Sequence, residues 1–236
     1  MIPEEPLHLV KLPVQFRGVF SNVYVCKDES GREFLFKEVK SQKVVLNELL
    51  AHRIAKVVGV PVLGFLERKT VDGKDGLVMT YLKDASLLTR YGKGLSWRQL
   101  RELQRIVVFD LLIGNRDRHS ANVLAGKHLI AFDHGRVFVD KSAVGMKFVK
   151  LEIGRLLDKN YVDKLEKISA GKAVSTMDAL VKWFGFRQED VDSVKRVSDS
   201  ELRRAIDSVE CPQRVRDSAY EYVFFRKKVF DSLSYC

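Results

Sequence analysis

One interval of the chain, residues 109–135, gathers side chains that could hold a metal ion and phosphate. Its polar residues include Asp117, Asn122 and Asp133, and glycines interrupt the apolar runs around them. Phosphoryl transfer needs a protein to hold Mg²⁺ against a triphosphate, neutralise charge and orient the attacking oxygen. Mg²⁺ prefers hard oxygen ligands and keeps several waters, so carboxylates and an amide oxygen suffice. The interval therefore predicts a base, Asp117, and two metal ligands, Asn122 and Asp133.

The elements around these residues must bring the two ligands together. Ala121 to Leu124 and Leu129 to Phe132 are short apolar runs, and the turn between them lies at Gly126–Lys127. This pattern is typical of a β-hairpin. A hairpin of that length carries Asn122 and Asp133 back to the same end, where they can share a cation.

Two motifs in the interval, from Gly114 to Asn122 and from Ile130 to Gly135, are similar to motifs of a known family. They resemble the catalytic loop and metal-binding motif of the HipA-like kinases and the related phosphatidylinositol 3/4-kinase-like superfamily. Those families carry an Asn-x-Asp-Arg-His-x-x-Asn loop, followed by an Asp-Phe-Gly or similar triplet. In this chain His134 occupies the middle of the triplet. Two motifs in order at the right separation are more specific than either one alone.

The resemblance implies roles for residues of the loop. Asp117 accepts or orients the proton of the substrate hydroxyl, and Asn122 and Asp133 bind Mg²⁺. His119 and Arg118 both belong to the motif. His119 helps to hold the loop or the γ-phosphate of ATP, and a structural salt bridge is an equal expectation for Arg118. Asp110 either braces the catalytic loop or makes one structural hydrogen bond.

The N-terminal part of the chain has the pattern of a β-sheet. Alternating apolar residues predict strands over residues 14–20, 22–27 and 32–39. The resemblance places the first turn, with Gly18, Ser21 and Asn22, over the nucleotide phosphates. It also makes Ser21 a candidate autophosphorylation site.

A lysine and a glutamate follow in the positions that such kinases use to bind phosphate. Apolar residues recur at helical spacing from Gln42 to Val58, and Gly59 supplies a stop, which predicts an amphipathic helix. The resemblance makes Lys37, on the third strand, the clamp for the α- and β-phosphates. Glu48, in the middle of the helix, then orients Lys37 through an ion pair; the alternative is a surface glutamate.

Two more strands are predicted, over residues 60–68 and 77–82, joined through Asp72–Gly73 and Asp75–Gly76 turns. The resemblance makes the end of the second strand a hinge, where backbone groups of Tyr81 and Leu82 meet the adenine edge. The expected fold is therefore α+β, a bilobal protein-kinase-like architecture. Residues 1–82 form an N-lobe of small β-sheet plus one helix that binds ATP, and residues 83–236 form a mainly helical C-lobe.

The second half of the chain is expected to be helical. Residues 83–95 suggest a crossing loop, and Ser96 to Gln99 has the form of a capping box that opens a helix. Residues 136–149 form an irregular basic stretch suited to an activation or substrate-binding segment. Further helices are expected over 152–157, 160–168 and 175–183, from Gln188, from Ser198 and from Arg214 toward Phe230. Their aromatic side chains are expected in the core rather than as a stacking surface for bases.

Composition limits the protein class and its partners. The net charge of +10 implies an anionic partner, although the basic residues are scattered apart from Arg226–Lys228, and a solvated basic surface explains them equally well. The three cysteines are widely separated and odd in number, which argues against a disulfide framework. The N-terminus lacks the pattern of a signal peptide, and no apolar run approaches the roughly 20 residues of a membrane span. We therefore expect a cytoplasmic protein.

Three functions are compatible with these residues. The first is an ATP- and Mg²⁺-dependent HipA-like serine/threonine kinase, whose phosphate acceptor is a protein. The second is a kinase of a lipid head group or small metabolite, because fold does not fix substrate. The third is a catalytically silent nucleotide- or nucleic-acid-binding module that uses the +10 charge. Steep salt dependence of nucleic-acid affinity without turnover distinguishes the third from the others.

Overall fold

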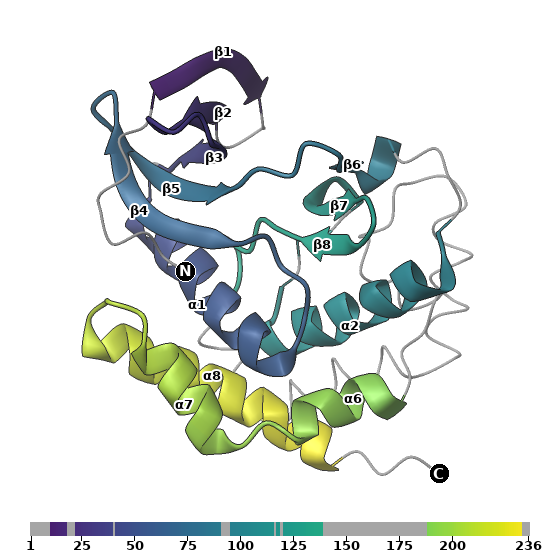
Figure 1. Ribbon diagram of the computed structural model, residues 1–236. Helices are drawn as coiled ribbons and strands as arrows, with labels where there is room; N and C mark the ends of the chain where they lie inside the picture. The colour runs from purple at the N-terminus through teal and green to yellow at the C-terminus, as the bar shows by residue number, and fades with distance from the viewer. Residues whose placement is uncertain are drawn as a thin grey trace, which may run out of the picture.

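The chain folds into a β-sheet at one end and a layer of helices at the other (Figure 1). A computed structural model describes residues 10–17, 22–39, 41–90, 95–115, 117–118, 120–138 and 188–232. The large sheet is antiparallel, with the strand order β1-β2-β3-β5-β4. Its strands are β1 Val10–Arg17, β2 Asn22–Lys27, β3 Glu33–Glu38, β4 Phe65–Val71 and β5 Lys74–Thr80.

The central strand β3 separates a small apolar core from a charged side chain on the opposite face. Phe34 and Phe36 are buried in a cluster with apolar residues of β2, β4 and β5. Successive side chains of a strand point to opposite faces. Lys37, the next residue after Phe36, therefore leaves this cluster, yet it is only 7% exposed. The sheet thus presents a buried lysine toward the rest of the molecule.

The helix α1, Gln42–Val58, has the bounds that the sequence predicts. Gly59 ends it in the left-handed region, with φ of 76°. Its apolar residues, among them Leu50 and Ile54, belong to the same buried cluster as residues of α2, α6, α7 and α8. Figure 1 shows α1 between the large sheet and α7, Asp199–Asp207. The helix that carries Glu48 is therefore packed into the core of the helical layer.

Two predictions about the sheet are wrong at their edges. Residues 60–64 were expected in a strand, but β4 begins only at Phe65. Instead, the backbone N–H of Leu63 donates to the carbonyl of Ala131, and the N–H of Ala131 donates to Pro61. Gly76 was expected in a turn, but it lies inside β5, opposite Glu38 of β3. A Cβ there would collide with the Lys37 carbonyl and the Phe36 ring, so the close approach of the two strands requires glycine.

A second, three-stranded sheet carries the residues of the expected hairpin. The hairpin is confirmed: β7, Val123–Ala125, pairs with β8, Leu129–Ala131, in antiparallel fashion. The crossing loop expected over residues 83–95 is partly wrong, because it contains the strand β6, Ser86–Leu87, and a 3₁₀ turn at Leu88–Arg90. The edge of β7 is thus covered by β6.

Four helices of the described residues form the rest of the helical layer. The predicted capping box opens α2, Trp97–Ile113, through the Ser96 and Gln99 side chains. The other three are α6 Gln188–Lys195, α7, and α8 Gln213–Ser232. The helices predicted between residues 152 and 183 lie outside the described residues. Among those described, no helix combines the length and apolar character that a membrane crossing requires.

The basic run at Arg226–Lys228 does not form a surface patch. Arg226 is 2% exposed and donates to the carbonyl of Leu111, while Lys227 is 6% exposed and contacts Asp231. Burial follows from helical spacing, because Arg226 lies on the face of α8 that carries Val223 and Phe230. Two of the three charges in this run therefore serve contacts inside the protein.

The residue that ends α2 gives a first prediction. Gly114 has φ of 66°, and a Cβ there would collide with the Tyr222 hydroxyl; Gly59 has φ of 76° with nothing within 4 Å. Left-handed backbone costs a non-glycine residue roughly 1–2 kcal/mol, and overpacking adds about 1–3 kcal/mol. We expect Gly114→Ala to lower the free energy of unfolding by more than Gly59→Ala, by the overpacking amount. Urea denaturation measures both.

The same pair of variants contains its own check. Adding Tyr222→Phe to Gly114→Ala removes the colliding hydroxyl and should recover part of the loss, whereas adding it to Gly59→Ala should recover nothing. Equal losses for the two alanine variants would contradict the assignment of a steric contact at the end of α2.

Candidate active site

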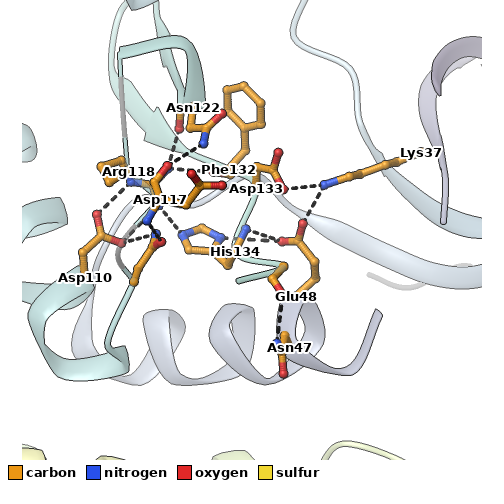
Figure 2. Close-up of polar contacts among 12 residues, drawn as sticks. Lys37, Asn47, Glu48, Asp110, Asp117, Arg118, Asn122, Phe132, Asp133 and His134 are labelled. Atoms are coloured by element: carbon orange, nitrogen blue, oxygen red, sulfur yellow. Dashed lines mark hydrogen bonds and ion pairs between the residues drawn. The ribbon is translucent and has the colours of Figure 1, made fainter. Parts of the chain in front are cut away.

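Lys37 and the two carboxylates around it form the centre of the candidate site (Figure 2). The Lys37 Nζ donates to Glu48 Oε1 and to Asp133 Oδ1, each at 2.8 Å. The three residues come from β3, from α1 and from the segment after β8. The ion pair expected between Lys37 and Glu48 is present, and Glu48 is not on the surface, since its side chain is fully buried.

The electrostatics of this cluster keep Lys37 and Glu48 charged. Burial alone lowers the pKa of Lys37, but the carboxylates of Glu48 and Asp133 outweigh it and raise that pKa above its ordinary value. Burial raises the pKa of Glu48, but Lys37 and the hydrogen bond from His134 outweigh it and lower that pKa to about 2. The side chain of Asp133 is 42% exposed, so the cluster opens to solvent on that side.

The segment after α2 is held by a buried arginine. Arg118 Nε donates to Asp110 Oδ2 at 2.7 Å, and its Nη2 donates to Asp110 Oδ1 at 3.1 Å. Its Nη1 donates to the carbonyls of Asn122 and Phe132. Both side chains of the Arg118–Asp110 ion pair are fully buried. Through these hydrogen bonds Arg118 connects α2 to the two ends of the β7–β8 hairpin. Arg118 thus makes the structural salt bridge, and Asp110 contacts Asn115 as well.

Asp117 is fixed by its backbone and leaves its carboxylate accessible. Its N–H donates to Asn115 Oδ1 at 3.0 Å, and its carbonyl accepts from Asn122 Nδ2 at 2.9 Å. Its side chain is 38% exposed, and Oδ2 lies 3.5 Å from Arg136 Nη1. Because Asn122 uses its amide nitrogen for Asp117, its oxygen is the atom that suits a metal ion.

The triplet Asp133–His134–Gly135 is bound from α1. Asp133 has φ of 61°, a region that aspartate tolerates better than most residues. The backbone N–H of His134 donates to Glu48 Oε2 at 2.8 Å. Asn47 Nδ2 donates to the carbonyls of Gly135 and Val137. A Cβ at Gly135 would meet Val44 of α1 at 2.7 Å, so the triplet lies directly against the helix.

Only some of the residues predicted to contact the nucleotide lie within the described part of the chain. Asn22 lies on β2 and its side chain contacts Glu38. Tyr81 and Leu82 follow β5 and are partly exposed. Gly18, Ser21 and His119 lie outside the described residues, as does most of the predicted substrate-binding segment, from residue 139 onward. Within the described part of the chain, no group of three His, Cys, Asp or Glu side chains forms a metal cluster.

Sequence reasoning gave no role to three residues of the site. Asn47 and Asn115 hold backbone groups of the triplet and of the loop, and His134 contacts Arg118. Asn47 precedes Glu48 on the buried face of α1, and Asn115 lies two residues before Asp117. A polar residue within two positions of a residue predicted for the site is therefore the sequence signal that could have identified them.

A buried histidine one turn after Glu48 predicts a pH dependence of stability. His52 is 5% exposed, and its Nδ1 has no hydrogen-bond partner. Burial, with Lys56 and Arg53 nearby, lowers its pKa from 6.5 to about 4. Between these values the unfolded chain binds a proton that the folded chain does not, so stability is full above pH 6.5 and falls toward pH 4.

We expect His52→Phe to remove this contribution. As the pH falls from 6.5 to about 4, the wild type should therefore lose stability relative to the variant, as the difference between their free energies of unfolding. Urea denaturation across this range measures it. A constant difference would contradict the assignment of a neutral His52.

Comparison with known proteins identifies the fold. No family model matches the chain. The structure matches that of the Helicobacter pylori proinflammatory kinase CtkA with a TM-score of 0.57 and 16% identity, over 95% of this chain and 94% of that chain. The fold is that of a bilobal kinase. The predicted α+β, bilobal kinase-like architecture is thereby confirmed.

One sequence match to a curated protein covers part of the chain. The chain is 32% identical to phosphatidylinositol 4-kinase gamma 2 of Arabidopsis thaliana over 113 residues, 45% of this chain. It spans about a fifth of the length of that protein, since the match covers 20% of it. Both matches concern kinases, and membership of the HipA-like family stays a prediction.

Proposed function

We propose that the protein is an ATP-dependent phosphotransferase that passes the γ-phosphate of ATP to a hydroxyl group. The observation that carries the proposal is the contact of Lys37 Nζ with both Glu48 and Asp133, at 2.8 Å each. Active kinases need a lysine–glutamate ion pair and a metal-binding aspartate in place together. In this chain the three groups are in direct contact through Lys37. The boundary between the lobes is proposed at residues 82–83.

The donor set at the site fits Mg²⁺. Asp133 offers a partly exposed carboxylate, and Asn122 offers an amide oxygen because its nitrogen is used by Asp117. Both are hard oxygen ligands, which Mg²⁺ prefers, and it keeps waters in its other positions. Mg²⁺ bound there neutralises charge on the phosphates. We assign Asn122 and Asp133 as its ligands.

The other residues of the site bind and orient the reactants. Lys37 is the cation that holds the α- and β-phosphates, and Glu48 keeps its ammonium group in position. Tyr81 and Leu82 are proposed at the adenine edge, and Gly18, Ser21 and Asn22 at the phosphates. His119 is proposed to hold the loop or the γ-phosphate.

Asp117 is the proposed acceptor of the proton from the attacking hydroxyl. As the acceptor oxygen bonds to the γ-phosphorus, the bond from that phosphorus to ADP breaks and the hydroxyl proton passes to the carboxylate. The Asp117 backbone is held at both its N–H and its carbonyl. Positioning of this kind is where a kinase gains most of its rate, because little covalent chemistry is required of the protein.

Two acceptor classes are supported by different observations. The motif resemblance to HipA-like kinases supports a serine or threonine hydroxyl of a protein, with Ser21 as a candidate site on the chain itself. The partial match to a phosphatidylinositol 4-kinase supports a lipid head group. Arg136, beside Asp117 and 53% exposed, suits an anionic acceptor of either class. The +10 charge is consistent with such a partner.

The experiment that tests the function also identifies the acceptor. The purified protein is incubated with Mg²⁺ and γ-labelled ATP together with a cell extract, which is then separated into protein, lipid and small-molecule fractions. Label in protein supports the first class, and label in lipid supports the second. Absence of label from all fractions, at the level of an Asp117→Ala control, would refute the proposed function.

A further inference from the structure

The side chain of His134 lies between the catalytic loop and the lysine clamp (Figure 2). His134 is 1% exposed, its Nε2 lies 2.8 Å from Arg118 Nη2, and its Nδ1 lies 3.7 Å from Glu48 Oε2. Its ring packs edge-on against Phe109 of α2, with centroids 5.7 Å apart. The residue therefore contacts both charged pairs of the site.

The contact with Arg118 fixes the state of the imidazole ring. A guanidinium group has only donors, so Nε2 of His134 must be the acceptor. The ring proton is then on Nδ1, on the side of Glu48 Oε2, which also accepts from the His134 backbone N–H at 2.8 Å. The ring thus accepts from Arg118, whereas the hydrogen bond to Glu48 comes from the backbone N–H of the same residue.

His134 completes a continuous path of polar contacts through the site. The contacts run in the order Asp110, Arg118, His134, Glu48, Lys37, Asp133, and the step from His134 to Glu48 is made by the backbone N–H of His134. Every side chain except the last is at least nine-tenths buried. In such water-poor surroundings polar contacts are strong, and an unpaired group is costly.

We propose that His134 is a positioning residue, which couples the catalytic loop to the Lys37 clamp by accepting a hydrogen bond from Arg118. The inference rests on the proposed function, because it assigns Lys37 to phosphate binding and Asp117 and Asn122 to transfer. Arg118 directly follows Asp117 and binds the carbonyl of Asn122. Loss of the His134 acceptor therefore affects the groups that carry out transfer.

Phenylalanine, the usual residue in the middle of this triplet in protein kinases, cannot serve here. Its ring can fill the space against Phe109, but it offers no acceptor to Arg118. A buried guanidinium N–H would then lose its partner. The backbone N–H of residue 134 is unaffected, so Glu48 and Lys37 keep their contacts in any variant at this position.

Three substitutions distinguish positioning from packing. His134→Gln retains an acceptor near the place of Nε2, His134→Asn is too short to reach Arg118, and His134→Phe keeps the bulk without an acceptor. We expect His134→Phe and His134→Asn to lower kcat about tenfold or more, since misplacement near a reacting centre has effects of this size. The KM for ATP should change by less than about threefold, because the clamp is kept. His134→Gln should restore most of kcat.

The result that overturns the proposal is equally specific. If the ring acts only by packing, His134→Phe will be as active as wild type or more active than His134→Gln. A second measurement, independent of activity, is the nitrogen chemical shifts of the His134 ring at neutral pH. The proposal requires a protonated Nδ1 and an unprotonated Nε2, and the opposite tautomer would overturn it. If the wild-type protein transfers no phosphate, that result refutes the proposed function rather than the contact of His134 with Arg118. The tautomer of the His134 ring then tests that contact by itself.

Discussion

Replacing Asp117 by alanine lowers turnover by about a hundredfold or more, the effect expected when general acid–base help is lost. The carboxylate is the group proposed to take the proton of the attacking hydroxyl, and it is 38% exposed in the site. The loop should keep its shape, because Asn115 and Asn122 bind the backbone of residue 117 rather than its side chain. Steady-state transfer of label from ATP measures the change in kcat.

The matched control for this variant is Asp84→Ala. Asp84 is exposed in the turn between β5 and β6, and no role in phosphate transfer is assigned to it. It should transfer phosphate like the wild type. Thermal unfolding of both variants tests whether each is folded. Unchanged turnover in a folded Asp117→Ala variant would rule out the assigned role.

Replacing Arg118 by methionine has the largest expected effect on stability. The guanidinium and the Asp110 carboxylate are both fully buried and form two hydrogen bonds, at 2.7 Å and 3.1 Å. Removing one partner of a buried ion pair leaves an uncompensated charge, at a cost of roughly 3–5 kcal/mol. The carbonyls of Asn122 and Phe132 lose a donor as well. Urea denaturation measures the free energy of unfolding.

An ion pair with an exposed arginine on α2, the helix that also carries Asp110, provides the comparison. Arg98 is 66% exposed and lies 3.4 Å from Glu102. Exposed i,i+4 pairs contribute about 0.3–0.5 kcal/mol, so Arg98→Met should change the free energy of unfolding by no more than that. Similar losses for Arg98→Met and Arg118→Met would show that the buried pair has no special structural weight.

Local sequence patterns predicted much of the fold, because apolar spacing, helix caps and turns are set by residues close together in the chain. Apolar spacing and Gly59 mark α1, and the Ser96 capping box marks the start of α2. The hairpin follows from two apolar runs around a turn. The segment over residues 60–64 was misread because its apolar composition suits a strand, whereas its partner is β8, which is remote in sequence.

Contacts between distant segments could not be predicted in the same way. Motif similarity predicted the Lys37–Glu48 ion pair, which is present, because the resemblance implies that spatial relation. The contact of Lys37 with Asp133 was not predicted. Motif similarity also gave no role to His134, whose contacts depend on where Arg118 and Glu48 lie in space. The burial of Arg226 was not predicted, because the basic run was considered by composition rather than by its position on a helix face.

The activity proposed for this chain is transfer of the γ-phosphate of ATP to a hydroxyl group. The most direct test is the total γ-label that the purified protein transfers, in the presence of Mg²⁺, to itself and to the fractions of a cell extract. We expect label in at least one acceptor class, and about a hundredfold less with Asp117→Ala. Wild-type labelling no higher than that of Asp117→Ala, in every fraction, would contradict it.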